Sequence, residues 1–355
     1  MDSITQFTLG AAVSTAILSR KLGPRKAALI GGFLGTLPDF DVFLPFDNAV
    51  DSFVLHRGWT HSLFVHALAA PVIGEALVRS IDVLKADRVR VWLAVFLCFA
   101  THTIIDAITV YGTRIFWPVY PDPVGVGSMF IIDPAFTLPL LVVVIWAFAK
   151  SRWSSAFQRL VMSALMFSTV YIGLGMILQA NAEARARAIF AESNIEPPNL
   201  FAIAAPFNII VWKVIGQEED RYHNLYLSLF DDDQSAIIYT HPTGYSLASC
   251  LAGLDSFEKL KWFSRGYYRA DLTDGRIVVS DLRMGVTPGY AFRFAIADYE
   301  GEHISPIEPE RLEGRGTTMD EDLKWLRQRL VGEQVIRPAE ADAVDRTIPM
   351  TTTSC

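Results

Sequence analysis

The sequence contains few of the residues that would indicate a soluble enzyme with a thiolate metal site. Only three of its 355 residues are cysteines, at positions 98, 250 and 355. They form no CxxC pair, which excludes a metal site built on neighbouring thiolates. Charged residues make up 19% of the chain and hydrophobic residues 51%, whereas a soluble domain has about 25% charged residues. This composition favours a membrane protein.

Several common catalytic motifs are also missing. The sequence has no GxSxG, no GxxxxGK[ST] and no GxGxxG in a suitable context, which excludes the usual serine-hydrolase, nucleotide-hydrolase and dinucleotide-binding chemistries. The formal net charge is −7, so the chain lacks the basic surface on which nucleic-acid binding depends. Nucleic acid is therefore not an expected partner.

Charge is distributed unevenly between the two halves of the chain. Residues 1–180 contain 13 Lys/Arg and 11 Asp/Glu, which leaves 18 and 27 for the remainder. We predict an α-helical polytopic membrane domain over residues 1–180. A smaller, mixed and β-rich extramembrane domain is expected over residues 181–338, followed by a disordered tail over residues 339–355.

About six membrane spans are expected, because a helix needs roughly 20 apolar residues to cross the hydrocarbon core. The candidate spans are Ile4–Leu18, Ala27–Leu44, Ser62–Val78, Val91–Tyr111, Met129–Ala149 and Leu160–Ala180. Of the 13 basic residues in the first half, 11 fall in the turns at 20–26, 79–90 and 150–159. The positive-inside rule then predicts that these turns are cytoplasmic, and that the site loops and the C-terminal domain face outward from a bacterial inner membrane.

The second half has the local pattern of a β-rich domain. Short β-branched or aromatic segments bounded by Gly, Pro, Asp or Asn are typical of strands. They occur at Ile209–Ile215, Asn224–Phe230, Ala236–Thr240, Arg276–Ser280 and Tyr290–Ile296. A capping box at Thr318–Glu321 predicts one amphipathic helix after it. The histidines and the three consecutive aspartates of this half, at 231–233, are assigned no catalytic role.

Three motifs place ionisable residues inside or beside the apolar spans. They are Gly35–Asp41, His56–Ser62 and Thr101–Asp106, the last followed by Tyr111-Gly112-Thr113. Ionisable groups at membrane depth are costly, so each motif is a candidate functional site. A single residue of this kind is as often a solvated boundary residue, and Arg57 is also compatible with simple snorkelling to the interface.

The predicted topology brings these motifs to one depth near the outer face. The candidate metal ligands are Asp39, Asp41, His56, His61, His102 and Asp106. Oxygen and imidazole donors suit zinc, manganese or iron, with a divalent zinc or manganese ion preferred. Asp2, Gln6 and Asp133 are candidate partners of the ligands, whereas His66 is expected to make a buried polar contact.

These motifs resemble those of the YdjM-like family of membrane-bound, predicted metal-dependent hydrolases. The resemblance is carried by Met1–Gln6, Gly35–Asp41, His56–Ser62 and His102–Asp106, and it continues more weakly at Ala205–Trp212. Many relatives have His where this chain has Gln6, which puts a ligand from the first helix in doubt. A fainter similarity links the His-x-x-x-Asp motif to the zinc sites of bacterial phospholipases C.

Together these patterns predict a metal-dependent hydrolase that acts on a membrane lipid or lipid-linked substrate, such as a phosphoester. Arg57 is expected to bind a phosphate group and Tyr111 to donate a proton to the leaving group. The alternatives are a metal-binding transporter and a non-catalytic membrane protein. A carrier is expected to place its polar groups near the membrane midplane and often in repeated halves, neither of which the sequence predicts.

Overall fold

The computed structural model describes residues 1–233, 236–301, 303–314 and 319–344. These residues form two compact units, a helical one and a β-rich one. The helical unit comprises Met1–Leu44, Arg57–Met176 and Pro206–Asn208, and the β-rich unit comprises Pro45–His56, Ile177–Ala205 and the described residues from Ile209 onward. The division near residue 176 lies close to the predicted domain boundary at residue 180.

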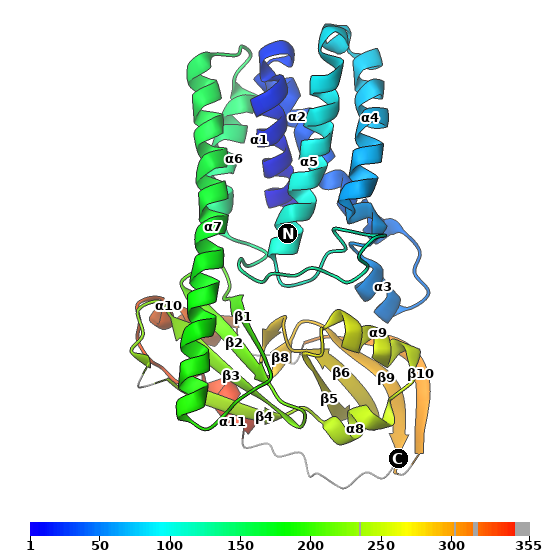
Figure 1. Cartoon of the computed structure of the whole chain (residues 1–355), viewed down its shortest axis with the longest axis vertical. Helices are drawn as coiled ribbons and strands as arrows, with labels where there is room; N and C mark the ends of the chain where they lie inside the picture. Colours follow the sequence, from blue (N-terminus) through cyan, green and yellow to red (C-terminus); the bar gives the residue numbers. More distant parts are fainter. Residues whose placement is uncertain (234–235, 302, 315–318, 345–355) are drawn as a thin grey trace. The chain divides into compact units, whose positions relative to one another are not determined.

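The helical unit is built from long helices (Figure 1), and short 3-10 segments lie between α2 and α5 along the chain. Its helices are α1 (Ser3–Leu22), α2 (Pro24–Thr36), α4 (Leu63–Ser80), α5 (Arg88–Ile108), α6 (Pro134–Ala149) and the first part of α7 (Ser155–Glu192). The 3-10 segments are η1 (Leu37–Phe43), η2 (Trp59–His61) and η3 (Asp82–Asp87). Helix α1 packs against α2, α5 and α6, and α4 packs against α5.

Among the described residues, three helical segments are long and apolar enough to cross a membrane: Leu63–Ser80, Asp82–Ile108 and Ser155–Glu192. Helix α6 is apolar but shorter. Each of the six predicted spans overlaps one helix, although α1, α2 and α6 do not meet the same criteria. The helical membrane region is thus confirmed, whereas the number of crossings stays a prediction.

Glycine allows α1 and α2 to approach each other closely. A Cβ atom at Gly10 would lie 2.3 Å from the carbonyl oxygen of Gly31, and one at Gly35 would lie 2.6 Å from that of Gln6. No real Cβ atom tolerates such a distance, so only glycine fits at this helix crossing, as is typical of packed membrane helices. The crossing fixes the C-terminal end of α2 beside Gln6 on α1.

Helix α2 ends earlier than the predicted second span. It stops at Thr36, and the chain continues from Leu37 to Phe43 as the 3-10 segment η1. Pro38 explains the change, because a proline has no N–H group to donate to the carbonyl oxygen four residues earlier, and its ring clashes with that carbonyl. The aspartates of the first motif therefore lie on η1, beyond the end of α2.

Two antiparallel four-stranded sheets form the β-rich unit, in the orders β1-β2-β3-β4 and β10-β9-β6-β5. The first contains β1 (Asn199–Ala204), β2 (Val211–Gln217), β3 (Arg221–Ser228) and β4 (Ile238–Pro242). The second contains β5 (Tyr268–Thr273), β6 (Arg276–Asp281), β9 (Arg293–Glu300) and β10 (His303–Leu312). A small hairpin joins β7 (Gly285–Val286) to β8 (Gly289–Tyr290). Each predicted strand overlaps one of these strands, which confirms the β-rich domain.

Four short helices accompany the sheets. They are α8 (Tyr245–Cys250), α9 (Asp255–Phe263), α10 (Met319–Leu330) and α11 (Pro338–Val344). Helix α10 is the predicted amphipathic helix, but its expected cap, Thr318, lies outside the described residues. Helix α11 covers the first residues of the segment predicted to be disordered, and residues 345–355 also lie outside the described residues.

A segment from the middle of the first predicted domain belongs to the β-rich unit. Helix α3 (Ala49–Leu55) packs against α9 and β10. Phe53 is 5% exposed, and its ring centroid lies 4.8 Å from that of Phe263 and 5.1 Å from that of Phe294. Asp51 forms a 2.6 Å ion pair with Lys259 of α9. The predicted boundary at residue 180 therefore misses this inserted helix.

Candidate metal centre

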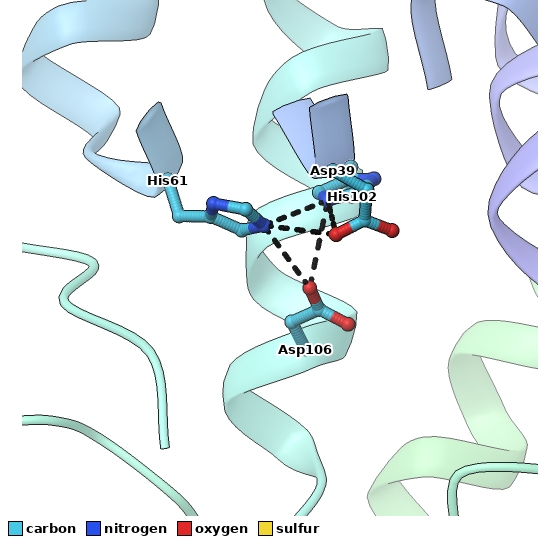
Figure 2. Close-up of side chains that lie close together, drawn as sticks. All are labelled: Asp39, His61, His102 and Asp106. Atoms are coloured by element: carbon cyan, nitrogen blue, oxygen red, sulfur yellow. Dashed lines mark hydrogen bonds and ion pairs between the residues drawn. The ribbon is translucent and has the colours of Figure 1, made fainter. Parts of the chain in front are cut away.

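Four predicted ligands converge at one point in the helical unit. Asp39 of η1, His61 of η2, and His102 and Asp106 of α5 each offer one ligand atom, and these atoms all lie within 4.8 Å of one another. His61, His102 and Asp106 are buried, and Asp39 is partly exposed. Figure 2 shows the four side chains pointing toward a common centre.

The distances within this cluster are close to those of a metal coordination shell. The Nε2 atoms of His61 and His102 lie 3.1 Å apart. Asp39 Oδ1 is 3.3 Å from His61 Nε2 and 3.5 Å from His102 Nε2, and Asp106 Oδ2 is 3.4 Å and 3.5 Å from the same two atoms. Two ligands of a tetrahedral zinc ion, each about 2.0–2.1 Å from the metal, are about 3.3 Å apart.

A backbone carbonyl fixes the tautomer of His102. The Nδ1 atom of His102 lies 2.6 Å from the carbonyl oxygen of Gly35, at the end of α2. A carbonyl only accepts hydrogen bonds, so Nδ1 carries the proton and donates it. The Nε2 atom of the neutral ring then has a free lone pair directed into the cluster, as in a metal-binding histidine.

Thr60 fixes the tautomer of His61 in a similar way. The Thr60 hydroxyl donates a 2.8 Å hydrogen bond to Asp41 Oδ2, and its oxygen lies 3.0 Å from His61 Nδ1. A hydroxyl has one hydrogen, so His61 Nδ1 must be the donor to Thr60. The Nε2 atom of His61 therefore also presents a lone pair to the cluster.

These contacts fit a cation at the centre. Two imidazole lone pairs that face each other at 3.1 Å repel unless a proton or a metal ion lies between them. Asp106 Oδ2 is buried and accepts no hydrogen bond among the described residues. Burial opposes a charge on His61, but its interactions with Asp106 and Asp39 outweigh this effect and raise its pKa, so that a proton on Nε2 would occupy the centre when no metal ion is bound. The cluster is therefore positioned to bind a positive ion.

Gln6 supports the cluster from helix α1. Its side-chain amide donates a 2.8 Å hydrogen bond to Asp106 Oδ1, the oxygen that faces away from the two histidines, and the amino group of Met1 contacts the same oxygen. The glutamine thus orients a candidate ligand through a hydrogen bond, in the role expected of a ligand partner. Asp2, by contrast, caps the first turn of α1 by accepting from the N–H groups of Ile4 and Thr5.

Arg57 lies beside the cluster in a strained backbone conformation. Its φ angle is +59°, a region that residues other than glycine rarely adopt. Its Nε atom lies 3.2 Å from Asp106 Oδ2, and its guanidinium carbon is 4.9 Å from the centre of the Tyr111 ring. The side chain is 8% exposed, and Nη1 has no hydrogen-bond partner among the described residues. The two predicted catalytic residues are therefore neighbours at the edge of the cluster.

Asp41 and His56 lie outside the four-residue cluster, but together with Asp39 they form a second grouping of potential metal ligands, whose ligand atoms lie within 4.8 Å of one another. Asp41 Oδ2 accepts hydrogen bonds from Thr60 Oγ1 and from the backbone N–H of Arg57, at 2.8 and 2.9 Å. It therefore contacts His61 through Thr60 and also directly, since Asp41 Oδ2 lies 3.6 Å from His61 Nδ1. His56 ends helix α3, where its N–H bonds to the carbonyl oxygen of Ser52, and it belongs to the β-rich unit.

The other polar residues considered in the sequence have structural partners. Asp133 caps α6 and accepts a 2.8 Å hydrogen bond from the Tyr171 hydroxyl. His66 Nε2 lies 2.8 Å from the carbonyl oxygen of Thr60, which is the predicted buried polar contact. In the β-rich unit, His241 pairs with Glu340 at 3.1 Å, and the described residues of this unit contain no grouping of potential metal ligands by themselves.

Sequence reasoning did not single out Thr60 or the carbonyl of Gly35, although both set a histidine tautomer. Thr60 lies inside the second motif, immediately before His61, and Gly35 begins the first motif. Both residues could therefore have been recognised from their positions within the predicted ligand motifs. A polar side chain beside a metal-binding histidine commonly orients the imidazole ring.

Apolar helices of membrane-spanning length and a buried Asp/His cluster define the class of this protein: it is a helical membrane protein with a site that is positioned to bind a metal ion. A sequence profile described as YdjM inner membrane protein matches residues 1–182. The chain therefore belongs to the YdjM inner membrane protein family.

Two relatives show similarity to part of the chain. The inner membrane protein YbcI of Escherichia coli is 30% identical over 155 residues, which cover 42% of this chain and 80% of YbcI. The uncharacterized protein YfhP of Bacillus subtilis is 28% identical over 153 residues, which cover 41% of this chain and 46% of YfhP. No solved structure matches the chain significantly.

Proposed function

We propose that this protein is a membrane-bound, metal-dependent hydrolase whose substrate is a phosphoester of a lipid-like molecule. The observation that carries the proposal is the 3.1 Å approach of the His61 and His102 Nε2 atoms, with Asp39 and Asp106 completing a set of four donors. Two imidazoles and two carboxylates suit zinc or manganese. A bound metal ion lowers the pKa of a coordinated water from 15.7 to about 7 and so supplies hydroxide at neutral pH.

The residues around the cluster provide the other requirements of phosphoester hydrolysis. Arg57 Nη1 is buried and without a hydrogen-bond partner among the described residues, so it is available to donate to a phosphate oxygen. Asp39, with a side chain that is 22% exposed, is the most accessible carboxylate of the cluster. It would give up its coordination position to the attacking water and accept the proton of that water. Tyr111, which packs against Arg57, is our candidate proton donor to the leaving group.

The same proposal includes the location of the site. With six crossings and cytoplasmic basic turns, the loops that carry the cluster face the outer side of the inner membrane, and so does the β-rich unit. A site at this depth meets lipid headgroups laterally, so the substrate can stay in the bilayer during the reaction.

Purified full-length protein in lipid nanodiscs provides the test. We expect one tightly bound divalent metal per cluster, turnover in a screen of lipid phosphoesters, and loss of both in His102→Ala. His303→Ala is the matched control, because His303 is exposed and lies on β10. Bound metal with metal-dependent flux into liposomes and no turnover would instead support the transporter. Protein without metal and without turnover would support a non-catalytic role.

A further inference from the structure

An open pocket of about 250 Å³ lies in the helical unit, and its walls are mainly apolar. The apolar lining includes Phe40, Leu44, Trp59, Ala69, Ile73 and Phe99. These residues come from η1, η2, α4 and α5 and from Leu44, just after η1. Pockets for whole drug-sized ligands enclose about 300–1,000 Å³, so this pocket is suited to one part of a larger molecule.

One wall of the pocket is shared with the metal-centre network. Asp41 and Thr60 both line it, and the Thr60 hydroxyl oxygen lies 3.0 Å from Nδ1 of the candidate ligand His61. None of the four cluster residues lines the pocket, so Asp41 and Thr60 form the boundary between the apolar pocket and the polar cluster. A ligand that contacts both regions would be amphiphilic.

His66 brings to the lining of this pocket a buried acceptor that has no donor in the described part of the chain. His66 lines the pocket and is 3% exposed. Its Nε2 atom lies 2.8 Å from the carbonyl oxygen of Thr60 and must carry the proton, which leaves Nδ1 with a lone pair. That Nδ1 atom is buried and has no hydrogen-bond partner among the described residues. A buried acceptor of this kind is normally satisfied by a ligand or by ordered water.

We propose that this pocket holds the hydrocarbon chain of a single-chain amphiphile and that His66 Nδ1 accepts a hydrogen bond from a hydroxyl group next to that chain. This inference rests on the proposed function and narrows its substrate to a single-chain lipid phosphoester with a free hydroxyl. The pocket size suits one chain, the cluster beyond Asp41 and Thr60 would receive the phosphate, and His66 would select for the hydroxyl.

The first part of the test concerns the chain. Full-length protein in nanodiscs is photo-crosslinked to lysophosphatidic acid that carries a diazirine in its acyl chain. We expect Ala69→Trp, which fills the pocket, to reduce crosslinking at least tenfold with the metal content unchanged. Leu68→Trp is the matched control, because the neighbouring Leu68 is 76% exposed and outside the pocket lining. Wild-type crosslinking in Ala69→Trp would overturn the pocket assignment.

The second part concerns the hydroxyl group. A deoxy analogue of the same probe, without that hydroxyl, should crosslink at least tenfold less to the wild-type protein, because a site built to bond a hydroxyl rejects a ligand without it. His66→Gln keeps a donor for Thr60 but removes the Nδ1 acceptor, so it should lose this discrimination. His66→Asn keeps an acceptor near Nδ1 and should retain it. Equal crosslinking of both probes to wild type, or retained discrimination in His66→Gln, would overturn the role of His66.

These results are independent of turnover. If the binding pattern is found but no phosphoester is hydrolysed, the hydrolase proposal fails and the binding pocket stands. If hydrolysis depends on the metal but Ala69→Trp has no effect on either turnover or crosslinking, the hydrolase stands and the pocket inference fails.

Discussion

His61 and His102 present their Nε2 atoms to each other at 3.1 Å, and each ring is held in that tautomer by a hydrogen bond on its opposite side. His102 depends on the carbonyl of Gly35, and His61 depends on Thr60. A buried pair of facing lone pairs has a clear electrostatic requirement, which a divalent cation satisfies together with Asp39 and Asp106. The hydrogen bonds behind the histidines are therefore as informative about the site as the ligands themselves.

The Thr60 hydroxyl can be tested directly. Thr60→Val removes the hydroxyl that accepts from His61 Nδ1 and donates to Asp41, while it keeps the volume of the side chain. We expect the affinity for zinc to fall by about 10–100-fold, the usual effect of losing a group that orients a ligand. Isothermal titration of metal-stripped protein measures this change. Thr60→Ser keeps the hydroxyl and should bind nearly as well as wild type, and an equal loss in both variants would contradict the assigned role.

The close glycine contact between α1 and α2 predicts that a larger residue at Gly35 reduces both stability and metal binding. Gly35→Ala adds a Cβ atom 2.6 Å from the carbonyl oxygen of Gln6, which forces the helices apart and shifts the carbonyl that binds His102. We expect a loss of about 1–3 kcal/mol in stability and weaker metal binding, as measured by thermal unfolding with and without metal. Gly173→Ala in α7 is the control, because no atom lies within 4 Å of its added Cβ. Similar behaviour of the two variants would contradict this account of the crossing.

The aromatic packing of helix α3 predicts that residues 45–56 are held within the β-rich unit. Phe53 is 5% exposed against the rings of Phe263, Phe292 and Phe294, so Phe53→Ala should cost about 3–5 kcal/mol of local packing. We expect faster proteolysis within residues 45–56, because this segment would lose its packing against the other aromatic rings of the β-rich unit. Leu55→Ala provides the comparison, since Leu55 on the same helix is 38% exposed. Unchanged proteolysis in Phe53→Ala would show that α3 is held by other contacts.

The buried side chain of Lys213 predicts that the stability of the β-rich unit depends on pH. Its ammonium group is buried and donates to the carbonyl oxygens of Leu282 and Gly285, and burial lowers its pKa from 10.5 to about 8. Between these values the unfolded chain binds more protons than the folded chain, so the contribution of Lys213 to stability rises with pH. The rise is on the order of 3 kcal/mol at most.

The comparison with Lys213→Met isolates this effect from other titrating groups. We expect the stability difference between wild type and variant to shift in favour of wild type as the pH rises from 8 to 10. Denaturant unfolding of the full chain, followed by tryptophan fluorescence at several pH values, measures it. If the difference in free energy of unfolding between the two proteins stays constant over this range, the pKa of Lys213 is not lowered in the folded state.

The sequence predicted the helical region and the ligand motifs because both leave local signals. Long apolar segments can be recognised without tertiary information. An aspartate or histidine within one of them, such as His102, indicates a functional site because an ionisable group at membrane depth is energetically unfavourable. The spacing of His102 and Asp106 by four residues placed both on one face of α5, and the structure shows them in one cluster. Membrane topology also predicted that the three motifs would meet.

The arrangement of individual side chains depends on tertiary contacts, which no local sequence pattern indicates. Asp39 and Asp41 are two residues apart on η1, yet Asp39 lies in the four-residue cluster, whereas Asp41 accepts a hydrogen bond from Thr60 on the opposite side of His61. The packing of Phe53 against Phe263 joins segments more than 200 residues apart in the sequence. Such long-range aromatic contacts produce no periodicity within a short window, so the inserted helix α3 could not be predicted.

X-ray absorption spectroscopy of the purified, metal-loaded protein is the most direct test of the metal centre. Zinc bound by His61, His102, Asp39 and Asp106 should show a first shell of nitrogen and oxygen at about 2.0–2.2 Å, with the outer-shell scattering of two imidazole rings. His61→Ala and His102→Ala should each remove one imidazole contribution. A first shell of oxygen alone, or an unchanged imidazole signal in both variants, would contradict a metal centre at these residues.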